Sequence, residues 1–223
     1  MFDRARFALT DSSRYGIVLI LLISAVMTAI IWPPGTLSSL LTATLQGASV
    51  IVALSRPTTG GALRVVQVCV VLASVAVAAL ARGSILRGLS DLLNAAVIVL
   101  LPVIILARFR RNLYVNVQSV LGAVCIYLVI GILFASVDSG ITSLTGQPFF
   151  GGAPKVTSSQ YTYFSFITLT TVGYGDLSPG SGVARALAVV EALTGQLYLV
   201  TVIALIVGRV GRPRDQGIGT SAG

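Results

Sequence analysis

Thr170–Asp176 reads TTVGYGD, and this stretch decides how the rest of the sequence is interpreted. It lies between two long apolar segments and follows a run rich in tyrosine and phenylalanine. Its two glycines permit backbone angles that are closed to residues with a Cβ atom, so successive carbonyl groups can turn toward one axis. Thr171 adds a hydroxyl oxygen at the foot of this column. A row of such oxygens can replace the water shell of a monovalent cation.

Composition indicates a membrane protein independently of this loop. The chain has 223 residues, of which 55% are hydrophobic and 10% are charged, and its mean hydropathy is +0.94. Ordinary soluble domains are far more polar. The formal charge of +8 does not indicate nucleic-acid binding, because the arginines stand singly or in threes between apolar runs, as they do in membrane loops.

The residue types present argue against catalysis. The sequence has no histidine, and its serine, aspartate and glutamate residues form no catalytic grouping, so we do not expect an enzyme. Cys69 and Cys125 both fall inside apolar stretches. They are predicted to be small buried hydrophobic residues rather than a disulfide or a metal-binding pair.

Six apolar segments are long enough, or nearly so, to cross a bilayer as helices, which takes about 20 residues each. They are Tyr15–Trp32, Leu37–Leu54, Leu63–Ala81, Leu89–Ala107, Leu113–Val137 and Val183–Gly208. The first lacks a small-x-small cleavage motif, so it is interpreted as a span rather than a signal peptide. The second is semi-polar, and we expect its hydroxyl groups to pack against neighbouring helices.

Arginine and lysine orient these spans. With the amino terminus in the cytoplasm, eleven basic residues lie on inner segments and four on outer ones, which is a positive-inside bias. We therefore expect a multi-pass protein of the plasma (cytoplasmic) membrane with both termini cytoplasmic. Arg108, Arg110 and Arg111, at the inner membrane edge, either bind anionic lipid headgroups or only mark the topology. The preference for arginine over lysine fits a GC-rich bacterial genome.

The connection between the last two spans divides into several parts. An outer turret is expected over Ser139–Ser158. A short helix is expected over Tyr161–Leu169, with Ser158 or Ser159 as its cap. Non-helical backbone at membrane depth is tolerated only where protein or an aqueous path satisfies it. Because one chain can surround an ion on one side only, several copies must close the ring.

Residues Leu113–Gly208 resemble the two-helix pore module of potassium channels, and every residue of the TVGYG signature is present. The resemblance implies an all-α membrane protein with six transmembrane helices, a re-entrant pore helix and a selectivity-filter loop, assembled as a homotetrameric channel in the lipid bilayer. It also implies K+ as the conducted ion. In this family the carbonyl groups of four residues form the ion sites, with the threonine hydroxyl at the cavity end. Here these are Thr171, Val172, Gly173 and Tyr174.

The same resemblance implies residues that support the filter. Thr170, Gly175 and Asp176 flank the ion sites, and Asp176 lies at the outer mouth. Tyr174 is expected to point away from the pore toward the aromatic residues of the pore helix. Tyr163 stands where relatives often carry a tryptophan that bonds this aspartate, and simple interfacial packing is the alternative.

Several residues of the last span are candidates for gating. Gly195 matches a glycine at which inner helices of this family can bend, and close packing against the pore helix is the alternative. Glu191 is an intramembrane carboxyl group, which suggests pH sensing or an interaction with the filter support. The interpretation that we prefer for it is a structural one, in which a partly or fully protonated carboxyl group is hydrogen-bonded to a pore-helix hydroxyl such as Thr168. A hydrophobic cytoplasmic constriction is expected among Val202, Ile203, Ile206 and Val207.

These elements predict the domain organisation. It comprises a cytoplasmic amino-terminal segment (1–14), a four-helix sensor-like domain without gating arginines (15–107), a cytoplasmic linker (108–112), a pore domain (113–208) and a short disordered cytoplasmic tail (209–223). The alternative functions are a weakly selective cation channel and a non-conducting membrane scaffold or auxiliary subunit. The intact glycines and tyrosine of the loop argue against both.

The expected fourth span, Leu89–Ala107, carries no arginine, whereas the sensor of voltage-gated relatives carries one at every third position. Moving one charge across the membrane is worth about 2.3 kcal/mol per 100 mV, so steep opening needs several charges. We therefore expect the conductance to depend only weakly on voltage in patch-clamp recordings. A gating charge of several elementary charges per subunit would contradict this prediction.

Overall fold

The computed structural model describes residues 2–32, 35–54, 76, 99, 117–152 and 156–210. Within these ranges every named secondary-structure element is a helix. The elements are α1 (Phe2–Ile31), α2 (Thr36–Leu54), α5 (Val117–Thr145), α6 (Ser158–Leu169) and α7 (Gly182–Val210). The expected third and fourth spans, apart from Ala76 and Val99, and the linker at 108–112 lie outside the described residues. The same holds for the tail after Val210.

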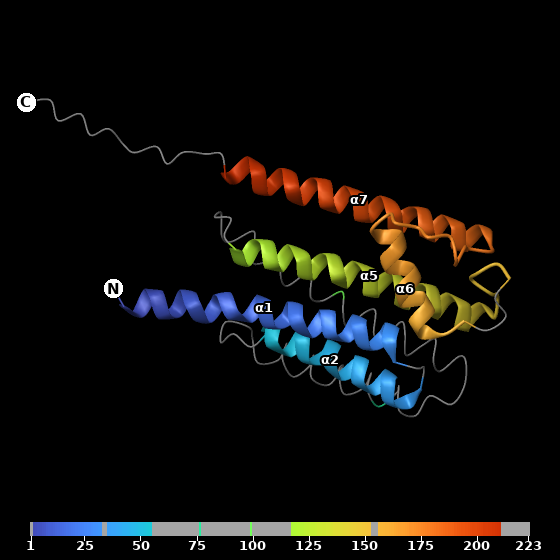
Figure 1. Cartoon of the computed structure of the whole chain (residues 1–223), viewed down its shortest axis with the longest axis horizontal. Helices are drawn as coiled ribbons and strands as arrows, with labels where there is room; N and C mark the ends of the chain where they lie inside the picture. Colours follow the sequence, from blue (N-terminus) through green and yellow to red (C-terminus); the bar gives the residue numbers. More distant parts are fainter. Residues whose placement is uncertain are drawn as a thin grey trace, which may run out of the picture.

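The long helices form a bundle in which α1 and α5 run one way and α2 and α7 run the other way (Figure 1). The beginnings of α1 and α5 and the end of α7 lie together at one end of this bundle (Figure 1). The short helix α6 lies at the opposite end, where it contacts α1, α5 and α7. The helix α2 packs against α1. The bundle therefore carries α6 and its loops at one end only.

Two of the helices are long and apolar enough to cross a membrane. These stretches are Ser119–Thr145 of α5 and Gly182–Leu205 of α7. Tyr15–Ile31 and Leu37–Ala53 are apolar helical stretches of shorter length. The first two and the last two of the six predicted spans thus coincide with helices.

Two predicted boundaries around α5 and α1 differ from the structure. The helix α5 continues to Thr145, past the predicted end at Val137, so the outer turret is shorter than expected. Inside this extension Thr142 and Thr145 donate their hydroxyl groups to carbonyl groups four residues earlier, at 3.0 and 2.7 Å. The helix α1 starts at Phe2, so most of the expected amino-terminal segment 1–14 is helical.

The cap of α6 is Thr157 rather than Ser158 or Ser159. The Thr157 backbone N–H donates to Gln160 Oε1 at 2.8 Å, as in a capping box. The helix therefore begins at Ser158, before the predicted start at Tyr161. The sequence signal was present as a threonine followed three residues later by a glutamine, but two neighbouring serines competed with it.

One narrow face of α7 packs against the rest of the bundle. Ala184, Glu191 and Gly195 are buried along this face, at helical spacing. A Cβ atom added to Gly195 would lie 2.2 Å from the Leu169 carbonyl oxygen at the end of α6. The glycine therefore allows α7 to approach the α6 backbone, which is the packing role that the sequence analysis named as an alternative to a hinge.

We expect Gly195→Ala to lower the stability of the protein. The added methyl group has no space beside Leu169, and overpacking of this kind costs about 1–3 kcal/mol. The matched control is Gly16→Ala in α1, because a Cβ atom there would meet nothing within 4 Å. Alanine in an open helical position should instead stabilise by up to about 1 kcal/mol. Thermal unfolding of the purified variants measures both effects, and equal midpoints would contradict the packing role.

Candidate functional site

The TTVGYGD loop leaves the carboxyl end of α6 with an unusual backbone. Thr171, Gly173 and Gly175 have φ angles of 58°, 50° and 81°. Positive φ is ordinary for glycine, whereas a β-branched residue rarely adopts it. The freedom of the two glycines is predictable from the sequence, whereas the left-handed conformation of Thr171 is not. Strained backbone of this kind tends to cluster at functional sites.

Hydrogen bonds to the last turn of α6 fix the direction of the peptide groups in this loop. Val172 N and Gly173 N both donate to the Ile167 carbonyl oxygen, at 2.9 and 3.1 Å. In a planar trans peptide the N–H and the preceding C=O point in opposite directions, and no cis peptide bond occurs among the described residues. The carbonyl groups of Thr171 and Val172 therefore both point away from α6, toward the same side.

The side chain of Thr171 accepts a hydrogen bond from a residue of α7. Gln196 Nε2 donates to Thr171 Oγ1 at 3.1 Å. This contact joins the inner end of the loop to the helix that follows it. The sequence analysis did not single out Gln196, although an amide beside Gly195 in an apolar span was a visible signal.

The outer end of the loop lies beside α6. The Tyr163 hydroxyl is close enough to Asp176 to interact with its carboxyl group. Partial burial raises the pKa of Tyr163, and so does this interaction with Asp176. Of the two interpretations of Tyr163 considered from the sequence, the structure thus has the contact with the aspartate.

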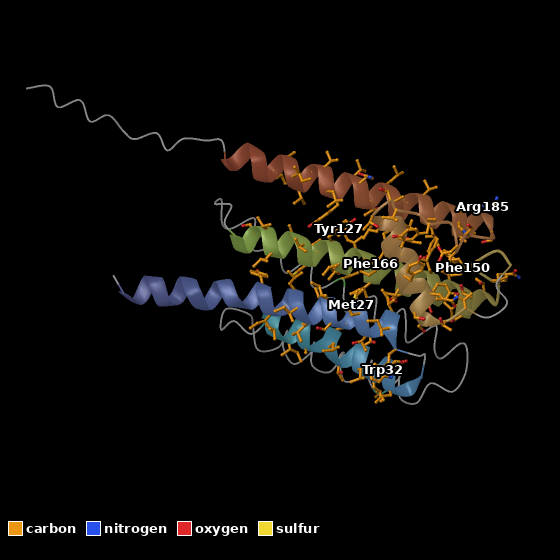
Figure 2. The ribbon with its side chains drawn as sticks, in the orientation of Figure 1. Met27, Trp32, Tyr127, Phe150, Phe166 and Arg185 are labelled. Atoms are coloured by element: carbon orange, nitrogen blue, oxygen red, sulfur yellow. The ribbon has the colours of Figure 1, made fainter. Side chains whose placement is uncertain are left out.

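A small aromatic cluster lies beside this outer end, where Figure 2 shows Phe150 next to the loops around α6. Its members are Phe149, Phe150, Tyr161 and Phe164. Gly151 N donates to Ser178 O at 2.9 Å, and Gly180 N donates to Phe149 O at 2.7 Å. These two bonds fasten the segment after the TTVGYGD loop to the segment before α6.

The only glutamate of the sequence, Glu191, lies on the face of α7 that packs against α6. Glu191 is 0% exposed, and its Oε1 is hydrogen-bonded to the Ser165 hydroxyl. The preferred interpretation expected a hydroxyl of the pore helix, and the partner is Ser165 rather than Thr168. Both residues lie on α6, but Ser165 is on the face turned toward α7 and is fully buried. Asp138 lies within α5 and is 1% exposed.

The remaining candidates are placed as follows. Thr170 to Asp176 are all exposed in the single chain, and the Tyr174 side chain is 72% exposed. Among the described residues of one chain its ring is therefore mostly uncovered, and its packing against the aromatic residues of the pore helix stays a prediction. Val202 is partly buried and Ile203 is exposed near the end of α7. Ile206 and Val207 also belong to α7, but their side chains lie outside the described part. Cys125 is buried, as predicted, and Cys69 is not among the described residues.

We expect Tyr163→Phe to loosen the outer end of the loop, because phenylalanine has no hydroxyl to donate to Asp176. Backbone amides at Tyr174–Asp176 should then exchange their hydrogens faster in hydrogen–deuterium exchange. The control is Thr162→Ala, which removes a hydroxyl that bonds Ser158 O within the same helix. Equal exchange in both variants and the wild type would contradict a role of this bond.

Part of the chain that contains α6 and the TTVGYGD loop is similar to a known protein family. Residues 122–212 match the family described as ion channel. This range runs from within α5 through α6 and the TTVGYGD loop past the end of α7. It covers most of the candidate span Ser119–Thr145 and all of Gly182–Leu205. No curated protein matches the chain. Over residues 122–212, less than half of its length, the chain is therefore similar to the ion channel family.

Proposed function

We propose that the chain assembles as a homotetramer that conducts K+ selectively and passively across the plasma membrane. The observation that carries this proposal is the alternating handedness of the loop backbone. Thr171, Gly173 and Gly175 have positive φ angles, and Val172 and Tyr174 between them do not. Alternation of left- and right-handed residues turns successive N–H groups to one side and carbonyl oxygens to the other.

A column of aligned carbonyl oxygens suits an alkali cation that has lost its water. The carbonyl groups of Thr171 and Val172 point away from α6, as the bonds to Ile167 O require. Those of Gly173 and Tyr174 would continue the column. The Thr171 hydroxyl, bonded by Gln196, would complete it at the inner end. Four such columns would favour K+ over the smaller Na+ through cavity size or through the number of coordinating dipoles.

The exposure of the loop supports an assembly of several copies. Val172 and Tyr174 are 53% and 72% exposed in one chain, although one is aliphatic and the other aromatic. Along α7 most large apolar side chains are also exposed: Val183, Val189, Val190, Leu193, Leu197, Leu199, Val200, Ile203 and Leu205. Lipid and neighbouring copies would cover these groups. Four copies, as in the family it resembles, would close the ring around an ion.

The helix directions suit the six-span topology with a re-entrant α6. The helix α2 ends and α5 begins at the same end of the bundle, as a pair of spans between them would require (Figure 1). The helix α6 has 12 residues, or about 18 Å at 1.5 Å per residue, whereas the bilayer core is about 30 Å thick. It would therefore enter the membrane from the outside and return through the loop. Both termini would then be cytoplasmic.

Gating is proposed at the other end of α7. Val202, Ile203, Ile206 and Val207 belong to its final turns, away from α6, where a ring of apolar side chains could close the path by dewetting. The main role of Gly195 would be to let α7 pack closely against α6. That α7 also bends at this glycine during gating is a further proposal. Arg108, Arg110 and Arg111 would lie against anionic headgroups at the inner surface.

The proposal is tested by the reversal potential of the purified protein in planar bilayers with opposed K+ and Na+ gradients. We expect it to follow the K+ gradient. A reversal potential that follows Na+ equally would favour the weakly selective channel instead. A protein that carries no current in any ion would favour the scaffold.

A pair of glycine variants separates the filter from backbone strain in general. Gly173 and Gly152 both have positive φ, and a Cβ atom would meet nothing within 4 Å at either position. Alanine should therefore cost a similar strain of about 1–2 kcal/mol at both. Gly173→Ala is expected to abolish K+ selectivity, whereas Gly152→Ala in the outer turret should retain it. Retained selectivity in Gly173→Ala would refute the proposed ion path.

A further inference from the structure

A buried chain of polar groups links the three helices of the pore region. It runs from Glu191 of α7 through Ser165 of α6 to the Gly131 carbonyl group of α5. Ser165 Oγ lies 2.6 Å from Gly131 O, and the same Oγ is hydrogen-bonded to Glu191 Oε1. Glu191 and Ser165 are both 0% exposed, so no bulk water reaches these contacts.

The two hydrogen bonds of the Ser165 hydroxyl need two protons, and serine supplies only one of them. A serine hydroxyl has one proton, and a carbonyl oxygen can only accept. The contact with Gly131 O therefore uses the proton of Ser165. The proton between Ser165 and Glu191 must then come from the carboxyl group of Glu191. An ionised Glu191 would take the serine proton for itself, and two acceptor oxygens would face each other at 2.6 Å.

The surroundings of Glu191 also disfavour a negative charge. The charged group that acts on it from α5 is Asp138, which is itself buried. From α6 it meets the neutral Ser165, and no basic side chain among the described residues of these helices bonds it. Asp138 Oδ1, Asp138 Oδ2 and Glu191 Oε2 have no hydrogen-bond partner in the described part of the chain. A buried charge without a partner is costly.

We propose that Glu191 is a neutral, protonated acid in the folded channel, and that its proton positions α6 by tying it to α7 and, through Ser165, to α5. Ser165 is two residues before Ile167, whose carbonyl oxygen bonds the TTVGYGD loop. A shift of α6 would therefore move the loop. Deprotonation at high pH gives the serine proton to Glu191 and breaks the link from Ser165 to α5, so conduction is lost as the pH rises. This consequence for conduction rests on the proposed function, whereas the protonation of Glu191 does not.

Because Glu191 is the only glutamate of the sequence, one isotope label reports on it alone. The full chain is made by cell-free synthesis with glutamate that carries carbon-13 in its side-chain carboxyl group, and it is placed in lipid bilayers. Solid-state NMR or infrared spectroscopy then distinguishes acid from carboxylate. We expect the signal of the protonated acid at neutral pH. A carboxylate signal would overturn the proposal, whether or not the channel conducts, and this test needs no variant to fold.

The positioning role is tested by the pH profile of K+ flux into vesicles. Wild-type flux should fall over the same pH range in which the labelled carboxyl group ionises. Glu191→Gln, which keeps a hydrogen-bond donor, should conduct without this fall. Asp138→Asn should keep a pH transition, since Glu191 is still present. The role is wrong if the wild-type flux shows no transition that coincides with the label, or if Glu191→Gln shows the wild-type profile.

Failure of the proposed function has a different signature. If the wild type carries no K+ at any pH, the proposed conduction is wrong, while the labelled carboxyl group still reports its proton. The thermal unfolding midpoint then serves as the second readout of the tie. It should fall more steeply with rising pH in the wild type than in Glu191→Gln, where only the buried carboxyl group of Asp138 remains, and identical pH dependence of the two would overturn the tie.

Discussion

The last four carbonyl groups of an α-helix have no partner within the helix, and the way in which α6 satisfies them organises the whole site. In α6 these groups belong to Phe166–Leu169. Ile167 O accepts from Val172 N and Gly173 N, and Thr168 O accepts from Thr171 N. The end of the helix thus directs the backbone of the loop, and the peptide groups of the loop must turn their own carbonyl oxygens to the far side.

The last of these carbonyl groups connects α6 with both long helices of the pore region. Leu169 O accepts the Tyr127 hydroxyl of α5 at 3.0 Å and lies against Gly195 of α7. The Glu191–Ser165–Gly131 chain makes a second connection among the same three helices one turn earlier in α6. An apolar core alone would leave α6 free to slide, because dispersion contacts are not directional. Hydrogen bonds to α5 and α7 specify its position.

The site is complete on one side only. In the described part of the chain, α6 accepts hydrogen bonds from the back of the loop, Gln196 donates to the Thr171 hydroxyl at the inner end, and Tyr163 lies near Asp176 at the outer end. Its front, which carries the carbonyl groups proposed to meet the ion, is open together with the apolar surface of α7. This arrangement agrees with an ion path built between copies. In it, each chain would hold its loop in place by hydrogen bonds on one side and would supply carbonyl groups to the path on the other.

The sequence by itself determined the membrane class, the helices at both ends of the chain, the site at Thr170–Asp176 and its resemblance to a pore family, because hydropathy, glycine positions and a contiguous motif are local properties. Only the tertiary structure decided the left-handed conformation of Thr171, the role of Gln196, and Ser165 as the partner of Glu191. These depend on which faces of α5, α6 and α7 meet. Residues far apart in sequence, such as Gly131 and Glu191, become neighbours only through that packing, and a linear pattern carries no record of it.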